Sequence, residues 1–374
     1  MRIKDLFSDK PCNTGRQPEL DLAKTVLIIA LAFVHCTIEC TPEDGLTSGL
    51  PYFLDSVIGG PLGAPVLMFA MGFGMVYTRH GGAADFFRRG IKLGIVGYVL
   101  NLCRYTIPYL VGYAISGDSE QFLSDIIYKS LENDILIFAS LSFLLMSLFL
   151  RLNFRPWLML IIAYAMTICA TLLNGADLNN IPANIFIGYF IGTEDAEGLV
   201  RSYFPLFNWF VVPVFGYFFA YYFRLVKEKG KFYTIFSSPA AVITVIYLWT
   251  GIPAGRGVFG EGQLCYYHIT IADVTCAMVG VVALLGLYYV IVKYLPNPIM
   301  AFITETSVNI NSIYCIHWIF VVWITNVMLY IATGSQVLPL WITMILAAGI
   351  AAVSFTIAHY YKEFKHSRRK SNEK

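Results

Sequence analysis

Charged side chains are scarce in this sequence. Asp, Glu, Lys and Arg make up 13% of its 374 residues, whereas hydrophobic residues make up 57%. Soluble globular proteins carry about 25% charged residues, so the composition excludes a water-soluble protein with an ordinary polar surface. Apolar runs recur from Leu22 to Tyr361 and leave no room for a separate aqueous domain. We therefore predict one polytopic membrane domain over 1–374, with a cytoplasmic N-terminal tail at 1–20 and a basic cytoplasmic C-terminal tail at 362–374.

Three other features are missing. The 26 basic residues nearly balance the 24 acidic ones, so no charge bias points to nucleic acid as a partner. The eight cysteines show no paired metal-binding spacing and lie mostly in apolar runs, which indicates buried free thiols and no metal site. The polar stretch through Asp21 contains no short apolar core with a small-residue cleavage site, so no secretory signal peptide is predicted.

Long hydrophobic runs, in contrast, are abundant. The hydrocarbon core of a bilayer needs about 20 apolar residues per helix. By this rule the predicted spans are 22–40, 58–78, 91–112, 133–150, 157–174, 205–223, 237–252, 270–292, 308–330 and 338–361. The apolar segment 182–192 is too short to cross and is expected to be re-entrant or interfacial. The predicted fold is an all-α integral membrane bundle of about ten transmembrane helices.

The positions of the basic residues predict the orientation. With the N-terminus in the cytoplasm, 22 of the 26 Lys and Arg residues fall in the tails and loops on the inner side. An excess of Lys and Arg marks cytoplasmic loops. We therefore predict a multi-pass protein of the cytoplasmic membrane with both termini in the cytoplasm.

The first predicted helix carries a polar stripe. Lys24 and His35 are eleven positions apart, and a turn of about 100° per residue returns them to one face. A rise of about 1.5 Å per residue separates them by about 16 Å, which puts Lys24 at the cytoplasmic mouth and His35 inside the membrane. Asp21 and Glu39 lie close to the same stripe, which must face the bundle interior or a water-filled cavity. Taken alone, His35 fits a structural hydrogen bond to a neighbouring helix as well as it fits a functional site.

Several motifs resemble a known group of enzymes. The residues Arg16, Pro18, Glu19, Asp21, Lys24 and His35 resemble the opening of the membrane acyltransferase-3 family. The segments 64–76, 86–102, 203–219 and 307–320 are similar to successive helices of that family and of its heparan-glucosaminide N-acetyltransferase-like relatives. Met71 stands where these relatives usually have serine, so any role of that hydroxyl is absent here. The resemblance implies an integral membrane acyltransferase with acyl-CoA, most simply acetyl-CoA, as co-substrate and no permanently bound cofactor.

Such an enzyme needs cations at its cytoplasmic mouth and a base farther inside, because its donor has a phosphate-bearing head and a long thin arm ending in a thioester. Lys24 has the position of such a cation. Arg88, Arg89 and Lys92 form a basic cluster at the same mouth, where charge-assisted hydrogen bonds favour phosphate. Ordinary topology-setting charge explains that cluster equally well. Arg16, which opens the motif, completes the set of cations expected to bind the donor.

The candidate catalytic residues lie deeper. His35 is expected to act as general base, because imidazole titrates near the operating pH. Glu39, four residues on, is a candidate to accept a hydrogen bond from the other ring nitrogen, although a structural place among lipid headgroups is the favoured interpretation. Helix rise places Arg104 and His317 at a depth similar to that of His35. Arg104 is a candidate to stabilise an oxyanion or to pair with an acid, and His317 fits a site role and a structural role equally.

Two functions of different classes fit these features. The first is transfer of an acyl group, most simply acetyl, to a hydroxyl or amine of a glycan or other extracytoplasmic acceptor. The alternative is a secondary transporter of a small polar or sugar-like solute, which would also show intramembrane Arg and His and glycine-broken helices. No corresponding pair of broken segments occurs in the two halves of the chain, which favours the enzyme. The oligomeric state is left open.

Overall fold

The protein folds as an assembly of helices. The structure is a computed structural model and describes residues 3–60, 63–194, 202–251 and 266–372. These residues form helices and two isolated bridges, without any longer strand. The predicted all-α class is confirmed.

Nine helices in the described part of the chain are long and apolar enough to cross a bilayer. They are Pro18–Cys40, Gly49–Tyr77, Ser119–Arg151, Pro156–Leu173, Leu206–Phe223, Lys229–Thr250, Ile271–Tyr294, Asn297–Thr333 and Leu340–Lys365. Each corresponds to one predicted span. The span predicted at 91–112 is also helical, as α4 (Ala83–Asn101), η4 (Leu102–Thr106) and α5 (Ile107–Ser116). It is less apolar than the nine because polar residues such as Asn101 and Arg104 interrupt it.

The chain forms two compact units, each assembled from separated stretches. Unit 1 comprises Met1–Gln17, Gly60–Val99 and Leu131–Ile291, and unit 2 comprises Pro18–Gly59, Leu100–Ser130 and Val292–Lys374. We describe each unit by itself. The single domain over 1–374 stays a prediction.

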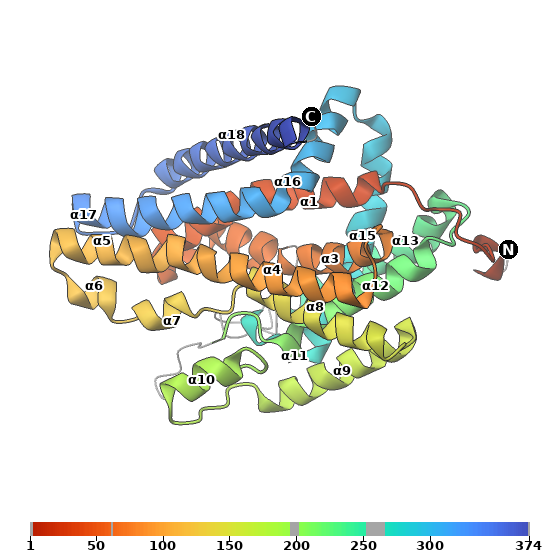
Figure 1. Ribbon diagram of the computed structural model, residues 1–374, viewed down its shortest axis with the longest axis horizontal. Coiled ribbons are helices and arrows are strands. Elements are labelled where there is room, and N and C mark those ends of the chain that lie inside the picture. Colours follow the sequence, from red (N-terminus) through yellow and green to blue (C-terminus); the bar gives the residue numbers. More distant parts are fainter. Residues whose placement is uncertain (1–2, 61–62, 195–201, 252–265, 373–374) are drawn as a thin grey trace. The chain divides into compact units, whose positions relative to one another are not determined.

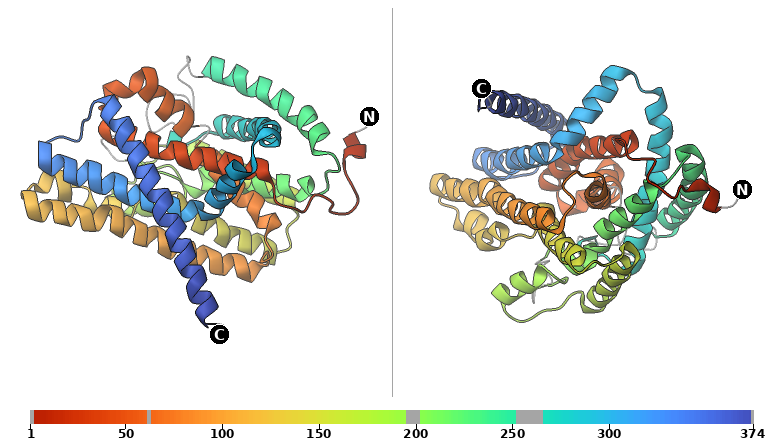
Figure 2. Two further views of the ribbon diagram at one scale, coloured as in Figure 1. Left: turned by 90° about the horizontal axis from the view of Figure 1, so that it is seen from above. Right: turned by 45° about the vertical axis from the view of Figure 1, so that its right-hand side comes forward.

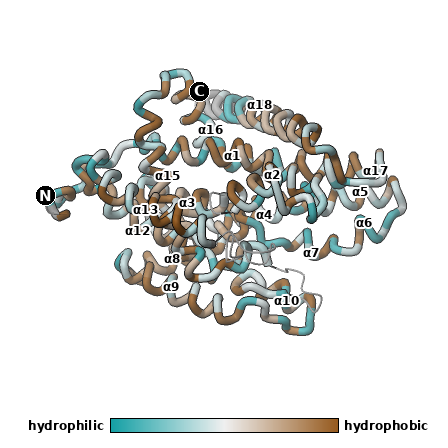
Figure 3. Tube along the Cα trace, turned by 180° about the vertical axis from the view of Figure 1, so that it is seen from behind, coloured by the Kyte–Doolittle hydropathy of each residue, from teal (hydrophilic) through white to brown (hydrophobic). Residues whose placement is uncertain are grey.

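Unit 1 is built around tightly packed apolar helices. Its elements are η1 (Ile3–Leu6), α3 (Ala64–Tyr77), most of α4, α8 (Ile135–Arg151), α9 (Pro156–Leu173), α10 (Ile181–Gly188), α11 (Leu206–Trp209), α12 (Val211–Phe223), α13 (Lys229–Gly251) and α15 (Ile271–Ile291). Helix α3 packs against α12, and α13 against α15 (Figure 1). The helices α3, α12 and α15 are predominantly hydrophobic along their traces (Figure 3). The segment predicted to be too short to cross contains only the eight-residue helix α10.

Unit 2 contains three long helices that pack on one another, α1 (Pro18–Cys40), α16 (Asn297–Val322) and α18 (Leu340–Asn372). Figure 2 shows α18 crossing α16 obliquely. The shorter elements of the unit are η2 (Glu43–Thr47), α2 (Gly49–Tyr52), η3 (Phe53–Gly59), η4, α5, α6 (Ser119–Leu123), α7 (Ile126–Ser130), η6 (Val292–Tyr294), η7 (Trp323–Leu329) and α17 (Tyr330–Thr333). The tail predicted from residue 362 continues α18 as helix to Asn372.

Candidate active site

The polar stripe of α1 faces α16. Near the start of α1, Thr25 Oγ1 donates to Ile303 O at 3.1 Å, and Ser307 Oγ donates to a carboxylate oxygen of Asp21. Farther along, His35 contacts His317. The first part of α1 thus contacts residues 303–307, and its later part contacts residue 317, so the two helices run parallel. The stripe therefore lies inside the unit, where neighbouring polar groups can satisfy it.

The two histidines form a pair joined through ring nitrogens. His35 Nδ1 lies 2.9 Å from His317 Nε2, and the two ring planes are inclined by only 8°. His317 is 1% exposed, whereas His35 is partly exposed. Helix rise predicts a similar depth for His35 and His317, and in the structure the two residues are in direct contact.

The backbone of α16 determines the direction of this hydrogen bond. His317 Nδ1 lies 3.1 Å from the carbonyl oxygen of Ile313, and a carbonyl can only accept, so Nδ1 carries the hydrogen. Burial favours the neutral ring, whose Nε2 then has a lone pair and accepts from His35 Nδ1–H. The second nitrogen of a neutral His35, Nε2, keeps its lone pair. The arrangement leaves one basic nitrogen on the partly exposed ring.

Trp318 and Arg104 complete the cluster around His35. The Trp318 ring stacks on the His35 ring with centroids 3.9 Å apart and planes inclined by 26°. Arg104 is 1% exposed, and its Cζ lies 5.0 Å from the Trp318 ring centroid and 4.6 Å from that of Tyr105. Such distances are typical of cation–π contacts. A base, a flat aromatic surface and a permanent cation therefore adjoin one another.

Arg104 is held by its own chain segment. Its Nε and Nη2 donate to Asn101 Oδ1 at 3.2 and 2.9 Å, and Asn101 Nδ2 in turn donates to Ser130 O at 3.3 Å. Arg104 lies in η4, a π-helical turn, a rare geometry that occurs frequently at functional sites. The bonds to Asn101 and the aromatic contacts help to offset the cost of burying a guanidinium.

Glu39 lies one turn beyond His35 on α1 and is partly buried. Within the described ranges it makes no hydrogen bond to His35, whose Nδ1 is bonded to His317 instead. The orienting role of Glu39 stays a prediction. Trp318 was not identified from the sequence, because nothing but its position next to His317 distinguishes it from an interfacial aromatic residue.

The cations expected to bind the donor are distributed over both units. In unit 2, Lys24 Nζ lies 3.3 Å from an Asp21 carboxylate oxygen, and its side chain is 20% exposed. The other four belong to unit 1. Arg16, Arg88 and Lys92 are exposed, and Arg89 Cζ lies 4.7 Å from the Phe143 ring centroid.

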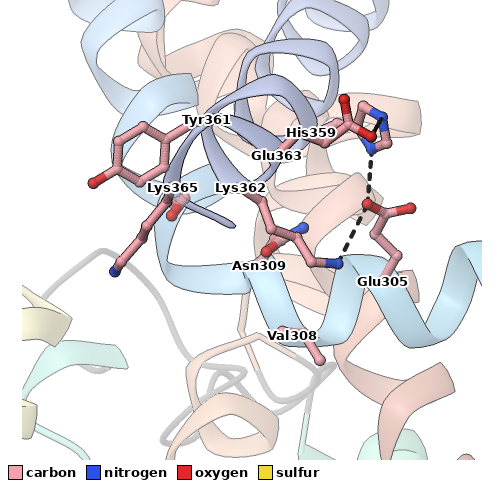
Figure 4. A pocket seen from close by; sticks show the side chains of 9 residues that line it. Glu305, Val308, Asn309, His359, Tyr361, Lys362, Glu363 and Lys365 are labelled. Carbon is pink, nitrogen blue, oxygen red and sulfur yellow. Dashed lines mark hydrogen bonds and ion pairs between the residues drawn. The ribbon is translucent and has the colours of Figure 1, made fainter. Parts of the chain in front are cut away.

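A cavity of about 560 Å³ lies between α16 and α18, lined by Glu305, Val308, Asn309, Ser312, His359, Tyr361, Lys362, Glu363 and Lys365. Its charged side chains form a network (Figure 4), in which His359 Nδ1 and Lys362 Nζ lie 2.7 and 3.5 Å from Glu305. Two carboxylates face two ammonium groups along the lining, which does not favour the phosphates of a nucleotide. No group of three or more His, Cys, Asp or Glu residues in the described part of the chain is arranged to hold a metal ion.

A comparison with known protein families assigns the chain to one of them. A family model described as heparan-alpha-glucosaminide N-acetyltransferase, catalytic, matches residues 16–252, which is 237 of the 374 residues. The chain belongs to this family. No curated protein and no solved structure matches the chain.

The family assignment makes the protein a membrane enzyme that transfers acyl groups. Of the two related families that the sequence resembles, the heparan-glucosaminide N-acetyltransferase family is the one whose model matches. The match gives no support to the transporter alternative. The matched residues include His35 and Arg104 but end before His317 and Trp318. The contacts of α16 with His35 therefore come from the structure alone.

Proposed function

We propose that the protein transfers an acetyl group from acetyl-CoA to a hydroxyl or amine of a glycan, with His35 as the general base. The observation that carries the proposal is the His35–His317 pair, in which the hydrogen-bond direction leaves His35 Nε2 as an acceptor. The family match supports acetyl transfer as the chemistry.

In the proposed step, the acceptor oxygen or nitrogen attacks the thioester carbonyl carbon while His35 Nε2 takes the acceptor's proton. The carbonyl electron pair moves to oxygen and forms a tetrahedral oxyanion. When the C–S bond breaks, the sulfur of CoA leaves and takes the proton from His35. General-base assistance of this kind contributes about 10²- to 10⁴-fold to a rate.

The neighbouring residues have supporting roles in this proposal. His317 holds His35 in the required tautomer, as the orienting acid of a catalytic triad does. Arg104 supplies fixed positive charge near the oxyanion, where a permanent cation in a dry site stabilises developing negative charge. Glu39 is retained as an acidic neighbour of the site on α1.

The donor is proposed to enter from the cytoplasm. Within unit 2 the phosphates contact Lys24 in this proposal. Arg16, Arg88, Arg89 and Lys92 of unit 1 stay predictions from the sequence for the same role. Lys24 already adjoins Asp21, so its charge is partly balanced before the donor binds. The acceptor glycan is proposed to lie on the opposite side of the cytoplasmic membrane. The cytoplasmic side is the one predicted to carry 22 of the basic residues.

The test is transfer of labelled acetyl groups by the purified protein to a panel of glycans. His35→Ala is expected to lower kcat by about 10²- to 10⁴-fold and to leave CoA affinity unchanged, because His35 touches only the reacting end of the donor. Lys24→Ala is expected to weaken CoA binding and to leave kcat unchanged. A His35→Ala variant with wild-type turnover contradicts the base assignment. If the wild-type protein carries a solute into proteoliposomes and does not bind CoA, the proposed acetyl transfer is wrong.

A further inference from the structure

One indole N–H beside the His35–His317 pair has no acceptor among the residues that the structure describes. Trp318 Nε1 is buried and makes no hydrogen bond to any described residue. Two other tryptophans show the usual arrangement within their own units. Trp209 Nε1 donates to Tyr267 O at 2.7 Å, and Trp323 Nε1 donates to Cys103 O at 3.0 Å. Trp318 therefore differs from them in its unsatisfied donor.

An unsatisfied buried donor is costly for the folded protein. An indole N–H removed from water loses its hydrogen bonds to solvent, and buried donors therefore nearly always have a partner. A donor left without one in the protein alone marks a place where a water molecule or a ligand atom can supply the acceptor.

The position of this N–H indicates which ligand atom it meets. The indole is rigid, and its plane stacks on the His35 ring at 3.9 Å with the Arg104 guanidinium nearby. Its N–H therefore lies in the same neighbourhood as the base. The indole nitrogen only donates. The acceptor hydroxyl or amine needs its lone pair for the attack, and a hydrogen bond from the indole to that lone pair would weaken the nucleophile. The thioester carbonyl oxygen, in contrast, can only accept.

We infer that Trp318 Nε1–H donates a hydrogen bond to the carbonyl oxygen of the acyl-CoA thioester. This hydrogen bond becomes stronger as the oxygen becomes an oxyanion. The inference rests on the proposed acetyl transfer. The new bond joins the acceptor atom to the carbonyl carbon, and the carbonyl electron pair becomes the third lone pair of the oxyanion. Trp318 loses no proton, and the C–S bond breaks when this pair returns.

The decisive variant is Trp318→Phe, which keeps an aromatic ring on His35 and removes the N–H. Removing one oxyanion donor lowers kcat by about 10²-fold, and we expect a loss of this size with KM for acetyl-CoA within about twofold of wild type. The pH profile should keep its shape, because the base is unchanged. The melting temperature should stay the same or rise, because the variant removes an unsatisfied donor.

Trp323→Phe is the matched control, since it makes the same change where the N–H already donates to a backbone carbonyl within unit 2. It should lower the melting temperature and leave kcat unchanged. A Trp318→Phe variant that keeps wild-type kcat overturns the inference. A Trp318→Phe variant in which kcat and the melting temperature both fall also overturns the inference, because that result is expected of a structural residue.

A binding measurement tests the inference independently of turnover. An acetyl-CoA analogue with a methylene group between sulfur and carbonyl keeps the carbonyl and cannot transfer its acyl group. Wild type should bind this analogue more tightly than CoA, and Trp318→Phe should lose most of that preference. Equal preference in both proteins overturns the role of Trp318. A wild-type protein that neither transfers nor hydrolyses the acetyl group overturns the proposed function instead.

Discussion

His35 and His317 share one hydrogen bond, and its direction decides which nitrogen of His35 can act as a base. The carbonyl oxygen of Ile313, one helical turn before His317, accepts from His317 Nδ1. The bond therefore runs from His35 to His317 and leaves His35 Nε2 with its lone pair. A backbone group of α16 thus acts through one side chain on the protonation of another.

The first prediction concerns this chain of bonds. His317→Ala removes the acceptor for His35 Nδ1–H and allows the unproductive tautomer, so kcat should fall by about 10²-fold. His317→Gln, whose side-chain oxygen can accept the same hydrogen bond, should recover part of the loss. The rates are measured with saturating acetyl-CoA. Equal rates in wild type and both variants would contradict the orienting role.

The second prediction concerns His268, which lies outside the spans in unit 1. Its ring Nε2 lies 2.8 Å from Ser202 Oγ, and the residue is 4% exposed. Burial lowers the pKa of His268 to about 4, and a hydrogen bond to the Ser202 backbone opposes this shift. Since the unfolded chain binds the proton at higher pH, stability is full above about pH 6.5 and falls toward pH 4, by about 3 kcal/mol in all.

The measurement is thermal unfolding between pH 7 and pH 4.5, and His268→Gln is the control. The variant lacks the titrating ring, so its melting temperature should depend less on pH over this range. A pH dependence as steep as that of wild type would show that other groups cause it.

At the scale of elements, the approach of α3 to α12 depends on two glycines. A Cβ at Gly72 would lie 1.8 Å from Pro213 O, and one at Gly216 would lie 2.2 Å from Phe69 O. The two backbones are therefore closer than any side chain permits, as occurs where small residues line a helix interface in membranes. A Cβ at Gly74, which lies on α3 with Gly72, would have open space around it.

The third prediction compares these positions. Gly72→Ala should destabilise the protein by about 3 kcal/mol, because a backbone oxygen cannot move aside without separating the helices. Gly74→Ala should be neutral or stabilise by up to about 1 kcal/mol through helix propensity. The quantities to compare are the melting temperatures in detergent. Similar effects at both glycines would contradict the close packing.

At the scale of the whole molecule, the orientation predicted from the basic residues can be compared with a contact between two basic segments of unit 1. Cys12 N–H donates to Arg224 O at 2.9 Å, so the N-terminal stretch and the turn after α12 lie at the same end of this unit. Both are basic segments that the sequence predicts to be cytoplasmic. The fold therefore agrees with a topology in which these two segments share a side of the membrane.

The fourth prediction uses Cys12, which is exposed. A membrane-impermeant maleimide should label it in inside-out vesicles and leave it unlabelled in right-side-out vesicles or intact cells. Cys12→Ser should remove this labelling and serves as the control. Labelling from the outer side would reverse the proposed orientation.

The sequence by itself determined the fold class and the helical spans, and it predicted a common depth for the candidate residues. These properties are local, because apolar run length and a fixed rise per residue are read along one helix at a time. His35, His317 and Arg104 could therefore be placed at one level before any contact was known. Asn101 and Arg104 also explain why the 91–112 helix is the least apolar span.

Only the tertiary structure decided which groups meet at that level. His35 Nδ1 is bonded to His317, the His35 ring is covered by Trp318, and Arg104 donates to Asn101. Such pairings depend on how each helix is rotated about its axis and which helix lies beside it. The rotation of a helix and the identity of its neighbour are both determined by packing between distant segments. His35 and His317, for example, are 282 residues apart in the sequence. No local pattern contains that information.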